Sequence, residues 1–205
     1  MNDISDKTSS RTKVIPVVDT MPADLLTPLS VYLKLSAGAA NSFLLESVEG
    51  GTSLARYSFI GADPDFVVSG TDASIDIKQN GETLRSECGL LSFLKTHFSG
   101  QEVEAGQDLP AFIGGAIGFL GFECSEWFEP TLKSGGRNQL NDEAAAAFMF
   151  YRSIVAFDHA KQVIKIISLV FDDGRTDVEE LTSDAAEQNK LIRAASLVKI
   201  GRAHV

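Results

Sequence analysis

The sequence predicts an α+β fold built from antiparallel sheets with covering helices. Three observations lead to this prediction. Strand-like and helix-like segments come in blocks, without the regular alternation that produces parallel βαβ units. The dipeptide Asn80-Gly81 lies between two short runs of strand character, and it is the strongest short signal for an antiparallel hairpin. Two long apolar runs, Ala145–Asp158 and Gln162–Val170, are separated by only three residues.

The first segments of the chain predict a polar lead-in, a strand and a helix. Residues 1–13 are polar and lack the hydrophobic core of a signal peptide, so we expect a disordered lead-in. A strand is predicted at Val14–Val18, and Pro16 favours an edge position because it cannot donate to a ladder. Thr27 then offers an N-cap, with Pro28 at the first position of a helix.

The middle of the chain predicts a small antiparallel sheet followed by a helix. Phe66–Ser69 reads as one strand, and Ser74–Gln79 is joined through the Asn-Gly turn to a return strand at Glu82–Arg85. Gly89–Phe98 carries a broad apolar stripe and predicts a helix. Ser99–Asp108 is polar and is expected to be a linker.

A glycine-rich apolar segment, Phe112–Phe122, predicts the next strand. It has no Walker lysine and no G-x-G-x-x-G spacing before a helix, which argues against a phosphate-binding loop. Glycines inside an apolar strand usually mark close approach of a neighbouring backbone, so packing is favoured over ligand binding. The acidic and aromatic segment at residues 123–129 has two interpretations, a partner surface or a solvated loop, and Lys133–Asn141 is expected to be a loop.

The last segments predict a buried hairpin and a long helix. The two long apolar runs are apolar on both faces in places, so their hairpin is expected to lie deep in a sheet that is covered on both sides. His159 lies at the turn of this hairpin and is expected to be exposed rather than to act as a catalytic base. Thr176–Val198 predicts an amphipathic helix of mixed charge.

Composition excludes several classes of function. The 205 residues, 44% of them apolar, can form one sizeable core. A net charge of −10 argues against nucleic-acid and anionic-membrane binding, both of which need basic surface. No segment reaches the ~20 apolar residues that span a bilayer. Cys88 and Cys124 lie far apart without metal-ligand spacing, which predicts reduced thiols in a cytoplasmic protein and no metal site.

The candidate binding site is the strand–corner–strand segment Phe43–Gly61. An apolar strand leads to Glu46 and Ser47, a Gly-Gly turn reverses the chain, and Arg56 opens a second apolar run. An acid, a hydroxyl and a guanidinium can together hold a zwitterion, because the acid takes the ammonium and the other two take the carboxylate. The alternative is an ordinary hairpin with a solvated tip.

Four motifs in order carry a family resemblance. They are Leu44-Leu45-Glu46-Ser47, the Arg-Tyr-Ser-Phe-Ile-Gly of residues 56–61, and the segments at Pro110–Phe122 and Phe148–His159. Together they resemble anthranilate synthase component I, the large subunit of the first committed enzyme of tryptophan synthesis, over about residues 14–170. The resemblance implies an α/β/β/α layering with two roughly orthogonal sheets, completed by residues beyond this chain.

The resemblance also implies a reaction and a partner. The full subunit would convert chorismate and ammonia to anthranilate and pyruvate, and a glutamine amidotransferase subunit would supply the ammonia. Chorismate and Mg²⁺ would bind in a C-terminal half that is missing here, so no catalytic residue is carried over and this chain alone is expected to be inactive. The alternatives are the large subunit of aminodeoxychorismate synthase, which makes a folate precursor, and a non-catalytic amino-acid-binding module.

Feedback inhibition by L-tryptophan is the property that the resemblance assigns to the strand corner. Tryptophan would bind where Leu-Leu-Glu-Ser meets the C-terminal half. Leu45 would line the indole pocket, and Glu46 and Ser47 would hold the polar end of the amino acid. Arg56 would assist with the carboxylate. The intact Leu-Leu-Glu-Ser and Arg-Tyr-Ser-Phe-Ile-Gly favour anthranilate synthase over the folate enzyme.

The expected organisation has four parts. The lead-in at residues 1–13 precedes an N-terminal domain at residues 14–175, and residues 176–199 form a helical linker towards the missing catalytic domain. The last residues, 200–205, read Ile-Gly-Arg-Ala-His-Val and resemble the translation of a common sequencing adapter. We therefore expect the reading frame to run into adapter sequence at that point.

Overall fold

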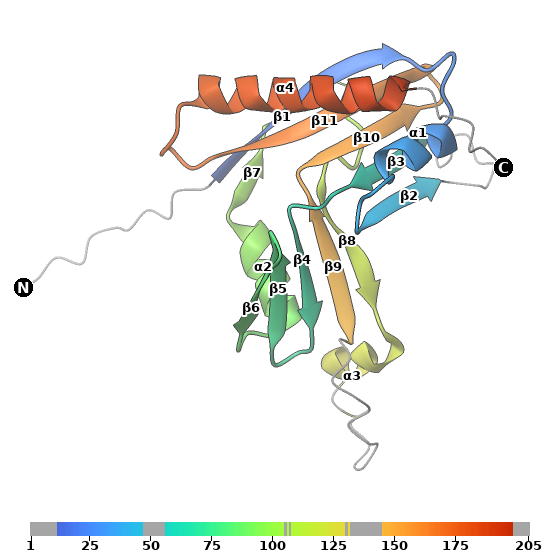
Figure 1. Cartoon of the computed structure of the whole chain (residues 1–205). Coiled ribbons are helices and arrows are strands. Elements are labelled where there is room, and N and C mark those ends of the chain that lie inside the picture. The colour runs from blue at the N-terminus through green and yellow to red at the C-terminus, as the bar shows by residue number, and fades with distance from the viewer. Residues whose placement is uncertain are drawn as a thin grey trace, which may run out of the picture.

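The computed structural model describes residues 12–46, 56–104, 106, 108–129, 131 and 145–198. Within these residues the strands form two sheets, which helices cover (Figure 1). Sheet A has the order β2-β3-β10-β11-β1-β7, and sheet B has the order β6-β5-β4-β9-β8.

The elements have the following bounds. The strands of sheet A are β1 (Thr12–Pro22), β2 (Ser42–Glu46), β3 (Tyr57–Ala62), β7 (Gln101–Val103), β10 (Ser153–Asp158) and β11 (Val163–Asp172). The strands of sheet B are β4 (Phe66–Gly70), β5 (Ile75–Gln79), β6 (Glu82–Ser86), β8 (Gly115–Leu120) and β9 (Ala146–Tyr151). The helices are α1 (Pro28–Leu35), α2 (Leu90–Ser99), α3 (Ser125–Phe128) and α4 (Val178–Leu197), with a 3₁₀ turn, η1, at Phe122–Cys124.

The pairing of the strands confirms the predicted α+β class with antiparallel sheets. Each pair of neighbouring strands in the described residues is antiparallel except β1 and β7, which are parallel. Figure 1 shows the strands of sheet A running across the direction of the strands of sheet B. Helices α1 and α4 lie on sheet A, and α2 lies beside sheet B (Figure 1).

Three apolar clusters follow this layering. The first joins sheet A to α1 and α4, and includes Ile60, Phe157 and Val31. The second lies between the two sheets, where Ile167 of β11 shares a cluster with Met149 of β9. The third packs α2 against sheet B. The order of layers is therefore helix, sheet, sheet, helix, which is the layering that the family resemblance implies.

Local sequence signals explain several elements. The Thr27 side chain accepts a hydrogen bond from the Ser30 backbone N at 3.1 Å, and the Ser30 hydroxyl accepts one from the Thr27 N at 3.0 Å. This capping box starts α1, with Pro28 as its first residue. Asn80 and Gly81 join β5 to β6 with φ of +51° and +81°, the left-handed backbone of a two-residue hairpin turn. The predicted cap and hairpin are confirmed.

The first strand is longer than predicted and shows how Pro16 is tolerated. β1 begins at Thr12, inside the expected lead-in, and pairs with β11 from Lys13 to Pro22. Its pairing with β7 reaches only from Thr12 to Val14. β1 is thus second from the edge of sheet A. Among the described residues, however, only β11 pairs with β1 at Pro16. A strand that is paired on one side only tolerates a residue without an N–H.

Two sequence expectations are wrong. The segment Ser99–Asp108 is not only a linker, because Gln101–Val103 forms β7 by parallel pairing with β1. The run Ala145–Asp158 is not one strand of a hairpin: β9 belongs to sheet B, β10 belongs to sheet A, and Arg152 lies between them. Both halves are apolar, so periodicity alone could not reveal the change of sheet. The hairpin of β10 and β11 is deeply buried, as predicted.

The glycine-rich strand begins later than predicted, at Gly115 instead of Phe112. Gly114 and Gly115 have φ of +142° and +114°, a backbone that other residues rarely adopt. A Cβ on Gly118 would lie 1.9 Å from the backbone oxygen of Ala147 on β9, so close backbone approach is confirmed there. The acidic segment after the strand forms η1 and α3, and the expected loop at residues 133–141 lies outside the described residues, as does the tail at 200–205.

The predicted C-terminal helix is α4, and a buried polar residue fastens it to sheet A. The Asn189 side chain donates to the Val17 backbone oxygen at 2.9 Å and accepts from the Ser168 hydroxyl at 2.8 Å. None of the helices in the described part of the chain is long and apolar enough to cross a membrane.

Candidate functional site

The predicted site lies where β2 ends, at one edge of sheet A. In the described residues β2 pairs only with β3, where Leu45 lies opposite Phe59 and Glu46 lies opposite Ser58. Glu46 is the last residue of the strand. Ser47 and the Gly-Gly turn lie outside the described residues, so their place in the site stays a prediction.

Leu45 and Glu46 point to opposite faces of sheet A, because successive side chains of a strand alternate. Leu45 shares a face with Phe43, which packs in the cluster between the sheets, and we call this the inner face. Glu46 shares the outer face with Leu44, which packs against the cluster under α1. Leu45 is 49% exposed and Glu46 is exposed. A ligand that touches both side chains therefore has to reach around the free edge or the end of β2.

Aromatic side chains cover the inner face next to Leu45. The rings of Tyr57 and Phe59 are stacked, with centroids 5.8 Å apart. Phe112 meets Phe59 edge-on at 5.5 Å and Phe43 at 6.3 Å. We call Phe43, Tyr57, Phe59 and Phe112 the aromatic wall. Such a wall offers an apolar ring both stacked and edge-on contacts.

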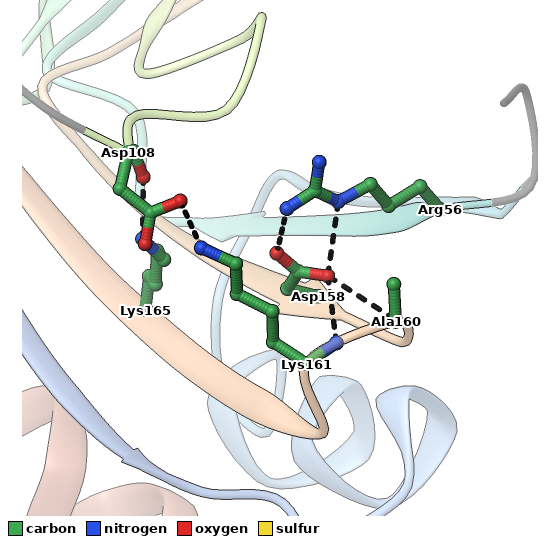
Figure 2. A network of polar contacts seen from close by, with 6 residues as sticks. All are labelled: Arg56, Asp108, Asp158, Ala160, Lys161 and Lys165. Carbon is green, nitrogen blue, oxygen red and sulfur yellow. Dashed lines mark hydrogen bonds and ion pairs between the residues drawn. The ribbon is translucent and has the colours of Figure 1, made fainter.

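The Arg56 guanidinium is already bound to a carboxylate of the chain. Its Nε and Nη2 donate to the two oxygens of Asp158 at 3.1 and 2.6 Å, a bidentate geometry (Figure 2). The same Asp158 accepts from the backbone N of Ala160 and of Lys161, both at 3.1 Å. The Arg56 hydrogen bond holds the pKa of the Asp158 carboxyl below its usual range. Nη1 of Arg56 and the second N–H of Nη2 have no hydrogen-bond partner among the described residues.

A second carboxylate extends this network across the inner face. Asp108, in the loop between β7 and β8, accepts hydrogen bonds from the side chains of Lys161 and Lys165 (Figure 2). Lys165 lies 2.8 Å from the Asp108 carboxylate and also donates to the Asp108 backbone oxygen. These two lysines lower the pKa of Asp108 to about 2. Lys161 therefore joins the two carboxylates, through its backbone N to Asp158 and through its side chain to Asp108.

A hydroxyl and an imidazole meet on the other side of the strand end. The Ser58 Oγ lies 2.7 Å from the His159 Nε2, and the His159 backbone N donates to the Arg56 backbone oxygen at 2.9 Å. Ser58 is buried, and the His159 residue is exposed as predicted. Within the described residues no carboxylate binds the other ring nitrogen, so nothing there orients His159 for base catalysis.

The chain resembles known proteins over most of its length. No family model matches it. The chain is 37% identical over 166 residues to a probable anthranilate synthase component 1 of Schizosaccharomyces pombe, a match that covers 81% of the chain and 31% of that protein. It is 34% identical over 185 residues to anthranilate synthase component 1 of Synechocystis sp., covering 90% of the chain and 35% of that protein.

The chain is homologous to part of anthranilate synthase component 1. It spans about a third of the length of the two relatives named above. A crystal structure of anthranilate synthase component I from Streptococcus pneumoniae matches with a TM-score of 0.45 and 23% identity, over 88% of this chain and 37% of that one.

In this anthranilate synthase homologue, the structure brings together only some of the predicted site residues. Leu45 lies on β2 and Arg56 directly precedes β3 at the same end of sheet A, and Glu46 lies opposite Ser58 on the outer face. Sequence reasoning missed Asp158 and the pair of Asp108 with Lys165. The sequence did hold a sign that Lys165 has a partner, since it is a single cation inside the apolar run of β11.

A separate cleft lies on the outer face, away from this site. Its volume is about 750 Å³, and its lining includes Ile60 and Ser168 of sheet A and Gln188 of α4. Neither Leu45 nor Arg56 lines it.

Proposed function

We propose that the chain is the N-terminal, regulatory portion of anthranilate synthase component I and that it binds the inhibitor L-tryptophan. The full-length subunit would convert chorismate and ammonia to anthranilate and pyruvate, with a glutamine amidotransferase subunit supplying the ammonia. The observation that carries the proposal is the sequence match of 34–37% identity over 81–90% of the chain. The names of those relatives favour this reading over aminodeoxychorismate synthase.

The strand corner offers each part of tryptophan a chemically suitable neighbour. Leu45 and the partly exposed rings of Tyr57, Phe59 and Phe112 present apolar surface to the indole ring, and the buried Phe43 supports them through its contact with Phe112. Glu46, which is exposed, accepts the ammonium group, and Ser47 donates to the carboxylate. Arg56 assists the carboxylate through Nη1, while Asp158 holds the rest of its guanidinium in place.

Chorismate and Mg²⁺ belong, in this proposal, to the part of the relatives that the chain does not cover. In the described residues no group of three or more His, Cys, Asp or Glu side chains is arranged to hold a metal ion, so the residues present do not fit Mg²⁺. We derive no catalytic step from this chain and expect it to be inactive alone. The free thiols of Cys88 and Cys124 agree with a cytoplasmic location.

The test is a tryptophan titration of anthranilate formation by the full-length subunit that contains this chain. Ser47→Ala should raise the tryptophan concentration for half-inhibition about tenfold or more, because a hydrogen bond to a charged group contributes about 1.5–3 kcal/mol. Ser47→Phe should abolish inhibition through its bulk, while catalysis survives. Thr83→Phe adds the same ring on the exposed strand β6 and should leave inhibition unchanged. Unchanged half-inhibition in both Ser47 variants would refute the assignment.

A further inference from the structure

We propose that Asp108 is a positioning residue for the tryptophan site: it fastens the loop before β8 to the inner face of sheet A and so sets the aromatic wall beside Leu45. We call its contacts with Lys161 and Lys165 the Asp108 latch. The choice of ligand rests on the proposed function. The latch itself rests on contacts of the described residues.

Lys165 places the latch on the same face as the predicted site. Lys165 lies opposite Ala156 of β10, and Ala156 lies opposite Phe59 of β3. Phe59 in turn lies opposite Leu45. Residues directly opposite one another share a face of a sheet, so this row runs across the inner face from the latch to the site.

The burial of Lys165 explains why the latch holds. Its side chain is only 7% exposed, and the neighbouring positions of β11 are apolar. A buried ammonium without a partner is strongly unfavourable, so Lys165 needs the Asp108 carboxylate. Lys165 also donates to the Asp108 backbone oxygen, which fixes the course of the loop and not only its charge.

A short, stiff segment carries this constraint from Asp108 to the aromatic wall. Pro110 is buried and has a fixed φ, and Phe112 follows two residues later. Phe112 contacts Phe59, which lies in the Leu45 row, and Phe43, which lies two residues before Leu45 on β2. Phe112 is four residues from Asp108, so a held Asp108 keeps it within about 14 Å. Its ring contacts with Phe59 and Phe43 then hold it on the inner face.

The first measurement follows the latch directly, by hydrogen exchange of the chain. Asp108→Asn should speed exchange of the backbone amides of residues 115–118 about tenfold or more, because β8 begins where this loop ends and its pairing with β9 opens more often when the loop is released. The control is Asp19→Asn, which removes a different ion pair, with Arg193 of α4, and should leave this exchange unchanged. Equal exchange in wild type and Asp108→Asn would overturn the proposal.

The second measurement separates positioning from stability, by tryptophan titration of the full-length subunit. Asp108→Asn should raise the half-inhibiting concentration about tenfold, the effect of losing about 1.4 kcal/mol of binding. Adding Lys165→Met removes the buried charge and should restore the melting temperature, yet inhibition should stay weak. Recovery of wild-type inhibition in the double variant would show a purely structural role and overturn the proposal. If wild type is not inhibited at all, the proposed function fails, and the exchange experiment still decides the latch.

Discussion

Asp158 connects two elements through one carboxylate. It binds Arg56 at the start of β3 and the backbone of the turn after β10, so it fixes both sides of the strand end. Arg56 lowers the pKa of Asp158, so the folded state binds this proton less tightly than the unfolded chain does. The resulting stability is present above the unfolded pKa of about 4 and is lost as pH falls through the lower folded pKa.

Asp158→Asn should therefore reduce the free energy of unfolding at pH 7 by about 1–3 kcal/mol, because it leaves a donor in place of a buried acceptor. It should also flatten the loss of stability between pH 5 and pH 3. Urea unfolding across this pH range checks both effects. Asp76→Asn, which removes a carboxylate only loosely paired with Arg85 at 3.9 Å, is the matched control. An unaltered pH dependence in Asp158→Asn would contradict the assignment.

The partly buried ring of His97 should also make the folded state less stable as pH falls. Its ring packs against Phe66, Phe93, Phe98 and Phe150, and burial lowers its pKa. Below the unfolded pKa of about 6.5 the unfolded chain takes up a proton that the folded state resists, so stability falls as pH decreases towards the folded pKa.

His97→Phe should remove this fall in stability on going from pH 7.5 to pH 5.5, because phenylalanine keeps an aromatic ring in the cluster without a titratable group. His159→Gln, at an exposed position, should retain it. Denaturant midpoints at the two pH values measure the difference. The interpretation is wrong if the two variants behave alike.

At the scale of elements, the backbones of β8 and β9 approach each other closely at Gly118. A Cβ there would meet the Ala147 oxygen at 1.9 Å, so Gly118→Ala should force the strands apart and lower the free energy of unfolding by about 3 kcal/mol. Gly100→Ala is the control, since a Cβ at Gly100 meets no atom within 4 Å. Chemical unfolding of both variants tests the comparison, and equal stabilities would show that β8 can shift at no cost.

The elements that could be predicted are those with local signals. The Thr27 cap, the Asn80-Gly81 turn and the apolar stripe of α2 lie within a few residues of the structure they specify. β7 and the change of sheet at Arg152 depend on partners far along the chain, which no local pattern contains. The same holds for the site. The strand that ends at Glu46 could be predicted, but the Arg56–Asp158 pair, separated by 102 positions, could not.

At the scale of the whole molecule, the two sheets differ in how their edges are protected. β6 and β7 carry charged residues or are short, which discourages pairing with another strand, although Leu84 of β6 and Val103 of β7 are also exposed. β2 and β8 bear exposed apolar side chains, with Leu45 49%, Phe119 59% and Leu120 42% exposed. In Figure 1 these two strands lie on the same side of the molecule. The chain also spans only about a third of its relatives' length.

We therefore expect the isolated chain to be marginally stable and to self-associate through β2 and β8, because exposed apolar strand edges pair readily with other chains. Light scattering at increasing concentration should show a growing mean mass. Phe119→Lys places a charge on the β8 edge and should reduce this growth. Leu84→Lys, on the already charged β6 strand, should leave it largely unchanged. A monodisperse monomer with a cooperative melt would show instead that the two sheets are complete in this chain, and that the open edges need no further strands.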